Sequence, residues 1–159
     1  MPLLTIENFS ELSFEKRGRF LGFDLGEKTI GLALSDITHS IATPFQVIQR
    51  TQWKKDSASL LKIINEHQIV GAIVGFPLNM DGSEGPRCQS TRQFVVNLLS
   101  LYDLPTCLWD ERLSTIAVTR TLIEADLSRA KRRQVVDKMA ASYILQGFLD
   151  AFKRLQKSI

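Results

Sequence analysis

The stretch FLGFDLGEKTIGLALS, residues 20–35, determines how the sheet of this protein begins. Phe20 to Leu25 is a short apolar run interrupted by Asp24, which is typical of a buried strand. Gly26-Glu27-Lys28 supplies a turn, and Thr29 to Ser35 forms a second strand-like run. Because only three residues separate the two runs, we expect an antiparallel hairpin.

Strands and helices alternate beyond this hairpin. Strands are expected at Phe45 to Gln49, Ile69 to Phe76 and Thr106 to Trp109, and helices at Ser57 to His67, Thr91 to Leu101, from Ser114 through Ile123 and from about Val135 to Leu155. The continuous apolar run Ile69 to Phe76 is typical of a strand covered on both faces. This order predicts an α/β fold with a mixed central sheet, antiparallel first strands and flanking helices.

Length and composition favour one intracellular domain. The 159 residues suit a single domain, expected at 18–159, preceded by an N-terminal extension, 1–17, whose order the sequence leaves open. No segment resembles a secretory signal or a membrane span. Cys88 and Cys107 lie far apart without metal-type spacing, which favours a reduced, cytoplasmic protein. The net charge of +3 permits an acidic partner without requiring one.

Asp24 is out of place in an apolar strand. Burying a lone carboxylate costs roughly several kcal/mol unless something compensates for the lost hydration. In one interpretation, Asp24 lies at the exposed end of the strand and accepts hydrogen bonds from the turn N–H groups of Gly26 and Glu27. In the other, it belongs to a functional site.

Glu111 follows the strand that ends in Leu108-Trp109-Asp110. Functional sites in α/β proteins collect where strands end. The simpler interpretation is a surface ion pair between Glu111 and Arg112, which contributes at most about 1 kcal/mol.

Asp137 lies three, four and seven residues before Ala140, Ala141 and Ile144, so it shares the apolar stripe of the last helix. It could instead be a first-turn acid that stabilises the helix N-terminus. Three acids from different elements that can face one sheet edge suggest a site for hard divalent cations. Oxygen ligands without His or Cys favour Mg²⁺ or Mn²⁺ over zinc.

Four motifs occur in an order known from one protein family. They are Phe23 to Gly31 (FDLGEKTIG), Gly75 to Ser83 (GFPLNMDGS), Trp109 to Thr115 (WDERLST) and Val136 to Ala141 (VDKMAA). Over about residues 18–152, the chain closely resembles the YqgF family, also called RuvX, of pre-16S rRNA nucleases and Holliday-junction-resolvase-like proteins. The resemblance implies an RNase H-like fold.

The resemblance also implies site residues. Asp24, Glu111 and Asp137 each match an acidic position of the family's catalytic set, and Asp110 matches a companion acid that could be a further metal ligand. Two metal ions in such a site can activate a water and stabilise the leaving oxygen of a phosphodiester. We therefore expect a hydrolase, a metal-dependent endonuclease with a two-metal mechanism that uses Mg²⁺ or Mn²⁺.

The expected substrate is nucleic acid, and two substrates fit the family. The first is pre-16S rRNA, whose 5′ end would be matured during ribosome biogenesis. The alternative is branched DNA, cut as a Holliday junction resolvase cuts it in recombination and repair. A second alternative is a non-catalytic nucleic-acid-binding module, which should be indifferent to metal removal. The sequence leaves a monomer and a homodimer equally open.

Five side chains are expected to contact the nucleic acid: Lys131, Arg132, Arg133, Asn79 and Arg112. The basic residues 131–133 could bind phosphates beside Asp137, or they could be only solvent-exposed charges at the start of the last helix. Asn79 to Ser83 could contact substrate or be merely a turn. An actin-like ATPase is not expected, because such proteins need two domains to close on ATP and this chain also lacks a P-loop.

Overall fold

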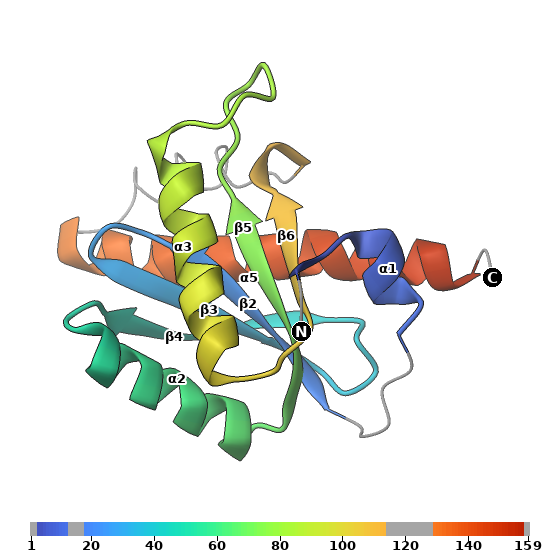
Figure 1. The fold of residues 1–159 in the computed structure, drawn as a ribbon, viewed down its shortest axis with the longest axis horizontal. Coiled ribbons are helices and arrows are strands. Elements are labelled where there is room, and N and C mark those ends of the chain that lie inside the picture. Colours follow the sequence, from blue (N-terminus) through green and yellow to red (C-terminus); the bar gives the residue numbers. More distant parts are fainter. Residues whose placement is uncertain (1–2, 13–17, 114–128, 158–159) are drawn as a thin grey trace.

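The computed structural model describes residues 3–12, 18–113 and 129–157. For residues 113, 129–137 and 157 it describes the backbone but not the side chains. A six-stranded sheet lies at the centre, in the order β1-β6-β5-β2-β3-β4 (Figure 1). The strands are β1 (Leu3–Leu4), β2 (Arg19–Leu25), β3 (Thr29–Ser35), β4 (Ala42–Gln49), β5 (Ile69–Phe76) and β6 (Thr106–Asp110). The helices are α1 (Ile6–Ser10), α2 (Trp53–Glu66), α3 (Pro86–Leu101), the short 3-10 helix η1 (Glu111–Leu113) and α5 (Arg129–Lys157).

The hairpin predicted from residues 20–35 is confirmed. β2 pairs antiparallel with β3, β3 pairs antiparallel with β4, and β5 and β6 run parallel to β2. The sheet is therefore mixed, as expected. β4 begins three residues before the predicted strand and runs through Pro44. A proline is tolerated there because β4 is an edge strand. Its outer side pairs with no other strand of the described sheet, so a missing N–H on that side removes no hydrogen bond between strands.

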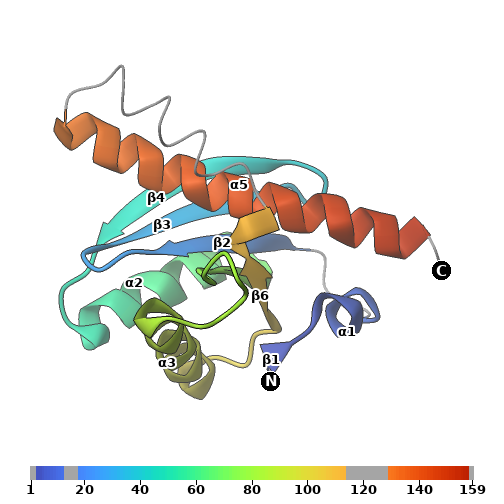
Figure 2. The same ribbon diagram turned by 90° about the horizontal axis from the view of Figure 1, so that it is seen from above.

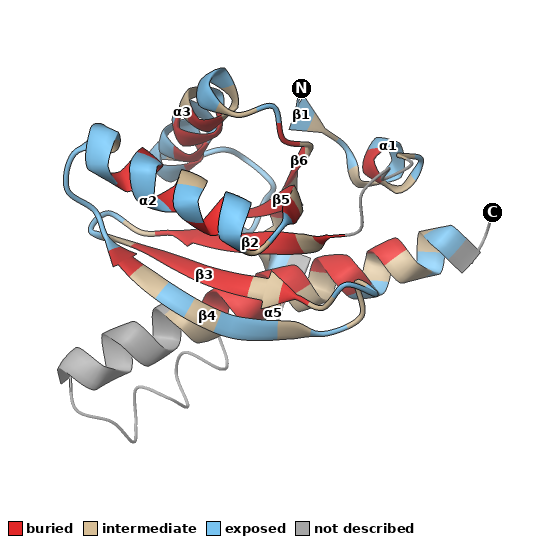
Figure 3. Cartoon of the chain, turned by 90° about the horizontal axis from the view of Figure 1, so that it is seen from below, coloured by how far each residue is buried: buried red, intermediate tan, exposed pale blue. Residues whose placement is uncertain are grey.

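Helices cover both faces of the sheet. Figure 2 shows α5 on one face and α2 and α3 on the other. The apolar side chains of β2 alternate accordingly: Leu21 and Phe23 pack in the core beneath α2 and α3, and Phe20 packs in the core beneath α5. Figure 3 shows β2 and β5 buried along most of their lengths, whereas the edge strand β4 carries exposed residues.

Part of the N-terminal extension is docked on the domain. Leu3 and Leu4 form β1, which pairs parallel with β6. Thr5 caps α1 by accepting a hydrogen bond from the Asn8 N–H at 3.1 Å. Phe9 of α1 is fully buried, with its ring centroid 5.3 Å from that of Phe148 in α5. The extension therefore adds to the core beneath α5.

Three helices begin earlier than their apolar patterns predicted. α3 starts at Pro86, since proline suits the first position of a helix. α5 starts at Arg129, so the basic stretch 129–133 lies within the helix rather than before it, and its Arg, Lys and Ala residues are good helix formers. α2 starts at Trp53. The helix expected from Ser114 lies outside the described residues. In the described part of the chain, no helix is long and apolar enough to cross a membrane.

Candidate active site

The carboxyl ends of three parallel strands, β2, β5 and β6, meet at one edge of the sheet. Asp24 lies at this edge as the last residue but one of β2. A Cβ on Gly22 would lie 2.8 Å from Cβ of Leu145, so position 22 faces α5. Side chains alternate along a strand, and position 24 therefore also faces α5. Asp24 is only 4% exposed, which excludes the interpretation of a solvent-exposed strand end.

Glu111 approaches the same place from β6. Phe23 pairs with Val74 across β2 and β5, so Asp24 and Gly75 occupy the next positions of these two strands. A Cβ on Gly75 would lie 2.6 Å from the Glu111 Oε1 and 2.5 Å from Cδ1 of Ile144. The Glu111 carboxylate thus lies over Gly75, beside α5. Because neighbouring strands are about 4.8 Å apart, Asp24 and Glu111 border one region beneath that helix.

Asp137 belongs to α5, four residues before Ala141 and seven before Ile144. Both Ala141 and Ile144 are fully buried in the core against the sheet. The side chain of Asp137 lies outside the described residues, so its place in the cluster stays a prediction. Among the described side chains, no three His, Cys, Asp or Glu residues are grouped closely enough to hold a metal ion.

Asp110 is bound by Arg112. The Arg112 Nη2 donates to the Asp110 Oδ2 at 2.7 Å, and Nε donates to Oδ1 at 3.0 Å. This guanidinium lowers the pKa of Asp110 below its ordinary value. Strand alternation turns Asp110 away from Trp109, which packs in the core beneath α5. Asp110, predicted as a possible metal ligand, therefore lies on the other face of β6 from the α5 side.

The loop from Pro77 to Gly85 stands at the same edge and is held from several sides. Arg112 donates to the Met80 carbonyl at 3.2 Å, and Arg92 of α3 forms a 2.9 Å ion pair with Glu84. The Cys88 thiol lies 3.4 Å from the Pro77 carbonyl. These contacts tie the loop to η1 and α3, and Met80 at its tip is 87% exposed.

Asn79 closes the turn inside this loop. The Asn79 side-chain amide donates to Ser83 Oγ at 3.0 Å, and the Asn79 backbone carbonyl accepts from the Gly82 N–H at 2.8 Å. Gly82 has φ of 89°, a conformation that favours glycine. Asn79 therefore shapes the loop; contact with nucleic acid stays a prediction. Lys131, Arg132 and Arg133 lie in the first turns of α5, and their side chains are outside the described residues.

The sequence pattern did not single out Gly75. Its function depends on Glu111, which is far away in sequence and comes close only through the pairing of β5 with β6. A glycine inside an apolar strand often marks a close approach of another group, and this was the available signal. The cysteines are not candidate nucleophiles, because both are buried and free, and burial raises the pKa of Cys107 to about 12.

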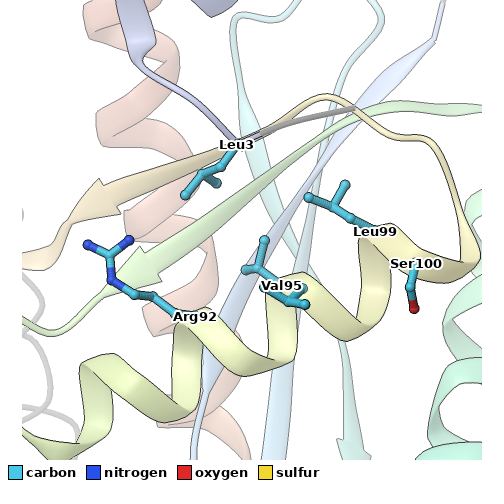
Figure 4. A pocket seen from close by; sticks show the side chains of 6 residues that line it. Leu3, Arg92, Val95, Leu99 and Ser100 are labelled. Carbon is cyan, nitrogen blue, oxygen red and sulfur yellow. The ribbon is translucent and has the colours of Figure 1, made fainter.

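Two cavities of about 480 Å³ each open on the α3 side of the sheet. One lies between β1 and α3 and is lined mainly by apolar side chains, among them Leu3, Val95 and Leu99 (Figure 4). None of its described lining residues is acidic, and the sheet separates it from Asp24 and Glu111. The second lies at the turn between β2 and β3 and is mostly polar.

Comparison with known proteins identifies the family. The family model described as "RuvX: Holliday junction resolvase" matches residues 18–151. This chain belongs to the RuvX family. RuvX relatives that bear the name "Putative pre-16S rRNA nuclease" include one from Paramagnetospirillum magneticum, 56% identical over 94% of this chain and 96% of the relative. Another, from Methylocella silvestris, is 56% identical over 88% of this chain and 87% of the relative.

Solved structures share the RuvX fold at low sequence identity. T. thermophilus RuvC, solved in complex with a Holliday junction substrate, has a TM-score of 0.54 and 13% identity over 86% of this chain and 94% of that chain. The yeast mitochondrial Holliday junction resolvase has a TM-score of 0.53 and 14% identity over 96% of this chain and 86% of that chain. These likenesses confirm the expected RNase H-like fold.

Proposed function

We propose that this chain is a metal-dependent endonuclease whose substrate is pre-16S rRNA, cut to mature its 5′ end. The observation that carries the proposal is the position of two carboxylates from different strands. Asp24 is almost completely buried on the α5 face, and the Glu111 carboxylate lies over the neighbouring Gly75. The names of the RuvX relatives supply the substrate. A cytoplasmic location is part of the same proposal.

The donor set fits a hard divalent cation. Asp24 and Glu111 offer only carboxylate oxygens, and Asp137 would add a third group from α5. Two carboxylates at about 4 Å repel by about 4 kcal/mol at an effective dielectric of 20, a cost that a cation removes. Mg²⁺ and Mn²⁺ prefer such oxygen ligands. When bound, two such ions supply an activated water and stabilise the departing oxygen of the phosphodiester.

The remaining residues orient the substrate strand. Asp110 pairs with the Arg112 guanidinium, which also donates to the Met80 carbonyl, so these bonds connect the loop to the end of β6 beside the acids. The basic residues at 131–133 lie in the turns of α5 that precede Asp137. We propose that they contact phosphates flanking the cut, because Lys and Arg bind phosphates without regard to base sequence.

Branched DNA is the second candidate substrate. The family description names a Holliday junction resolvase, and the fold is shared with resolvases. Phosphates and metal ions serve RNA and DNA cleavage equally well, so the substrate must be decided by experiment.

The test compares a precursor of 16S rRNA with a four-way DNA junction, each labelled at one 5′ end, in Mg²⁺, Mn²⁺ or EDTA. We expect metal-dependent cleavage of the rRNA precursor at discrete positions and none by Asp24→Asn or Glu111→Gln. Faster cleavage of the junction than of the precursor would show that branched DNA, and not pre-16S rRNA, is the substrate. Tight binding that EDTA does not change, without cleavage of either substrate, would instead show a binding module.

A further inference from the structure

The polar cavity lies next to the candidate site, across the strand β2. It opens between the β2–β3 turn, the segment after β4 and the first turns of α3, and its volume is about 480 Å³. Leu25, which follows Asp24 directly, lines the cavity and belongs to the core beneath α2 and α3. The cavity and the acids therefore share one sheet edge but lie on opposite faces of it.

Arg87 is the first of two arginines in this cavity. It follows Pro86 in the first turn of α3, and its Nη2 lies 3.3 Å from the Leu25 carbonyl. The N-terminal end of a helix carries partial positive charge, which disfavours a cation. The first turn of α3 contains no acidic residue, and the N-cap Gly85 offers no side chain. Stability of the helix therefore does not explain an arginine at this position.

Arg50 reaches the same turn from the end of β4. Its Nη1 donates to the Gly26 carbonyl at 2.8 Å, and its Cζ lies 5.8 Å from the centroid of the Phe94 ring. Both contacts hold the guanidinium in place. A guanidinium carries five N–H donors, so one bond to a carbonyl leaves others for a ligand. Glu27 is the one acid among the described lining residues, and the two arginines outnumber it.

We propose that this cavity binds a backbone phosphate of the substrate strand, at a position away from the cleaved bond. The inference rests on the proposed function. A strand that crosses the β2–β3 turn would present one phosphate to the acids beneath α5 and another to Arg50 and Arg87. The two guanidiniums can each donate paired hydrogen bonds to phosphate oxygens. Arg50 and Arg87 are thus positioning residues, which set the register of the strand relative to Asp24.

The test measures binding of a 12-nucleotide single-stranded RNA by fluorescence anisotropy in EDTA over a series of NaCl concentrations. Each phosphate bound on a single strand contributes about 0.7 to the slope of log K against log salt. Because the cavity would bind one phosphate, we expect the double variant Arg50→Gln/Arg87→Gln to reduce the magnitude of this slope by about 0.7. Arg50→Lys/Arg87→Lys should keep the slope, which separates lost charge from a damaged turn.

The control is Lys62→Gln, which removes one unit of charge, half of what the double variant removes, from the exposed side of α2, where Lys62 lies 3.9 Å from Glu66. This variant should leave the slope unchanged. An equal fall in slope for the control, or no fall for the double glutamine variant, would overturn the proposal. Inorganic phosphate, added as a competitor at fixed ionic strength, should displace the RNA only weakly. If phosphate binds to the wild type and not to the double glutamine variant, but the RNA slope is insensitive to both arginines, the cavity binds free phosphate alone and the proposal is wrong.

Because these measurements are made without metal, they do not depend on cleavage. A protein that cleaves neither substrate in Mg²⁺ or Mn²⁺ but shows the arginine-dependent slope keeps the phosphate site and loses the proposed nuclease activity. A protein that cleaves the precursor with unchanged slopes keeps the activity and loses the site. In the cleaving protein, the double glutamine variant should also shift or blur the cut positions, since the register of the strand is no longer set.

Discussion

The Glu111 carboxylate packs directly against the backbone of Gly75, where an added Cβ would lie 2.6 Å from Oε1. Gly75→Ala should therefore displace Glu111 and abolish cleavage. Overpacking of this kind costs about 1–3 kcal/mol of stability, and here Cδ1 of Ile144, 2.5 Å away, adds to it. Thermal melts and the cleavage assay measure the two effects separately.

A second substitution separates packing from chemistry. Ile144→Val removes Cδ1, so Gly75→Ala/Ile144→Val should recover much of the lost stability without recovering cleavage. Ile144→Val alone should cost about 0.5–1.5 kcal/mol and leave cleavage largely intact. Recovery of cleavage in the double variant would show that Ile144, and not the position of Glu111, caused the loss.

Asp24→Asn should abolish cleavage without weakening the metal-free fold. A carboxylate that serves metal binding is repelled by its acidic neighbours when metal is absent, so its neutralisation should leave the melting temperature unchanged or raise stability by about 1–2 kcal/mol. Mg²⁺ or Mn²⁺ should stabilise the wild type more than the variant, because a ligand of the native state adds stability by mass action. A variant that melts much lower in EDTA would make Asp24 a structural residue.

Replacing Lys131, Arg132 and Arg133 by Ala should weaken nucleic-acid binding and flatten its salt dependence. The slope of log K against log salt should change by roughly one for each phosphate that is no longer bound. Binding of the rRNA precursor at several salt concentrations measures this change, with Lys62→Ala as the control for removal of a surface charge. An unaltered slope would mean that the three residues only solvate α5.

The Asp110–Arg112 pair predicts a defined pH dependence. Arg112 lowers the pKa of Asp110, so the pair stabilises the folded protein above the unfolded pKa of the aspartate, about 3.9. That contribution is lost as the pH falls through the lower, folded pKa. Arg112→Gln should move the pKa of Asp110 upward, towards its ordinary value, as measured by NMR titration of the carboxyl carbon. An unmoved titration would exclude Arg112 as the cause.

Phe9→Ala tests the docking of the N-terminal extension. The ring is fully buried among Phe20, Phe148 and Phe152, and loss of such a side chain costs about 3–5 kcal/mol. Cleavage measured well below the melting temperature should stay close to that of the wild type, because Phe9 does not line the site. Leu3→Ala is the milder comparison, since Leu3 is 38% exposed. Equal melting temperatures for Phe9→Ala and the wild type would argue against the docked arrangement.

The sequence predicted those elements whose signal is local. β3 and β5 begin and end where predicted, because their apolar runs are bounded by turn residues. β1 and α1 were missed, since two and five residues are too short to show a period and Phe9 gains its role only through contacts distant in sequence. Similarly, the sequence alone left open whether Asp24 is buried. Asp24 is buried beneath α5, a helix that lies more than a hundred residues further along the chain.

The residues of the candidate site also differ in how far local sequence reveals them. Asp24 and Glu111 were predicted because acids at the ends of apolar strands are conspicuous. The roles of Gly75, Arg50 and Arg87 depend on contacts between separate elements, which no local pattern contains. The ion pair between Asp110 and Arg112 is an intermediate case. The two residues are near in sequence, but the geometry of β6 decides that Arg112 pairs with Asp110 and not with Glu111.

The two-residue strand β1 has a consequence for how molecules of this protein behave when crowded. Its two residues pair parallel with Thr106 and Cys107, so it covers the first part of β6 while offering very little new edge of its own. The opposite edge, β4, contains Pro44, which cannot donate a hydrogen bond to an incoming chain. Exposed sheet edges are templates for edge-to-edge aggregation, and short strands and proline suppress it. Loss of β1 would uncover Thr106 and Cys107 as well and leave the full length of β6 as an edge, so truncation of the first residues should favour self-association during folding.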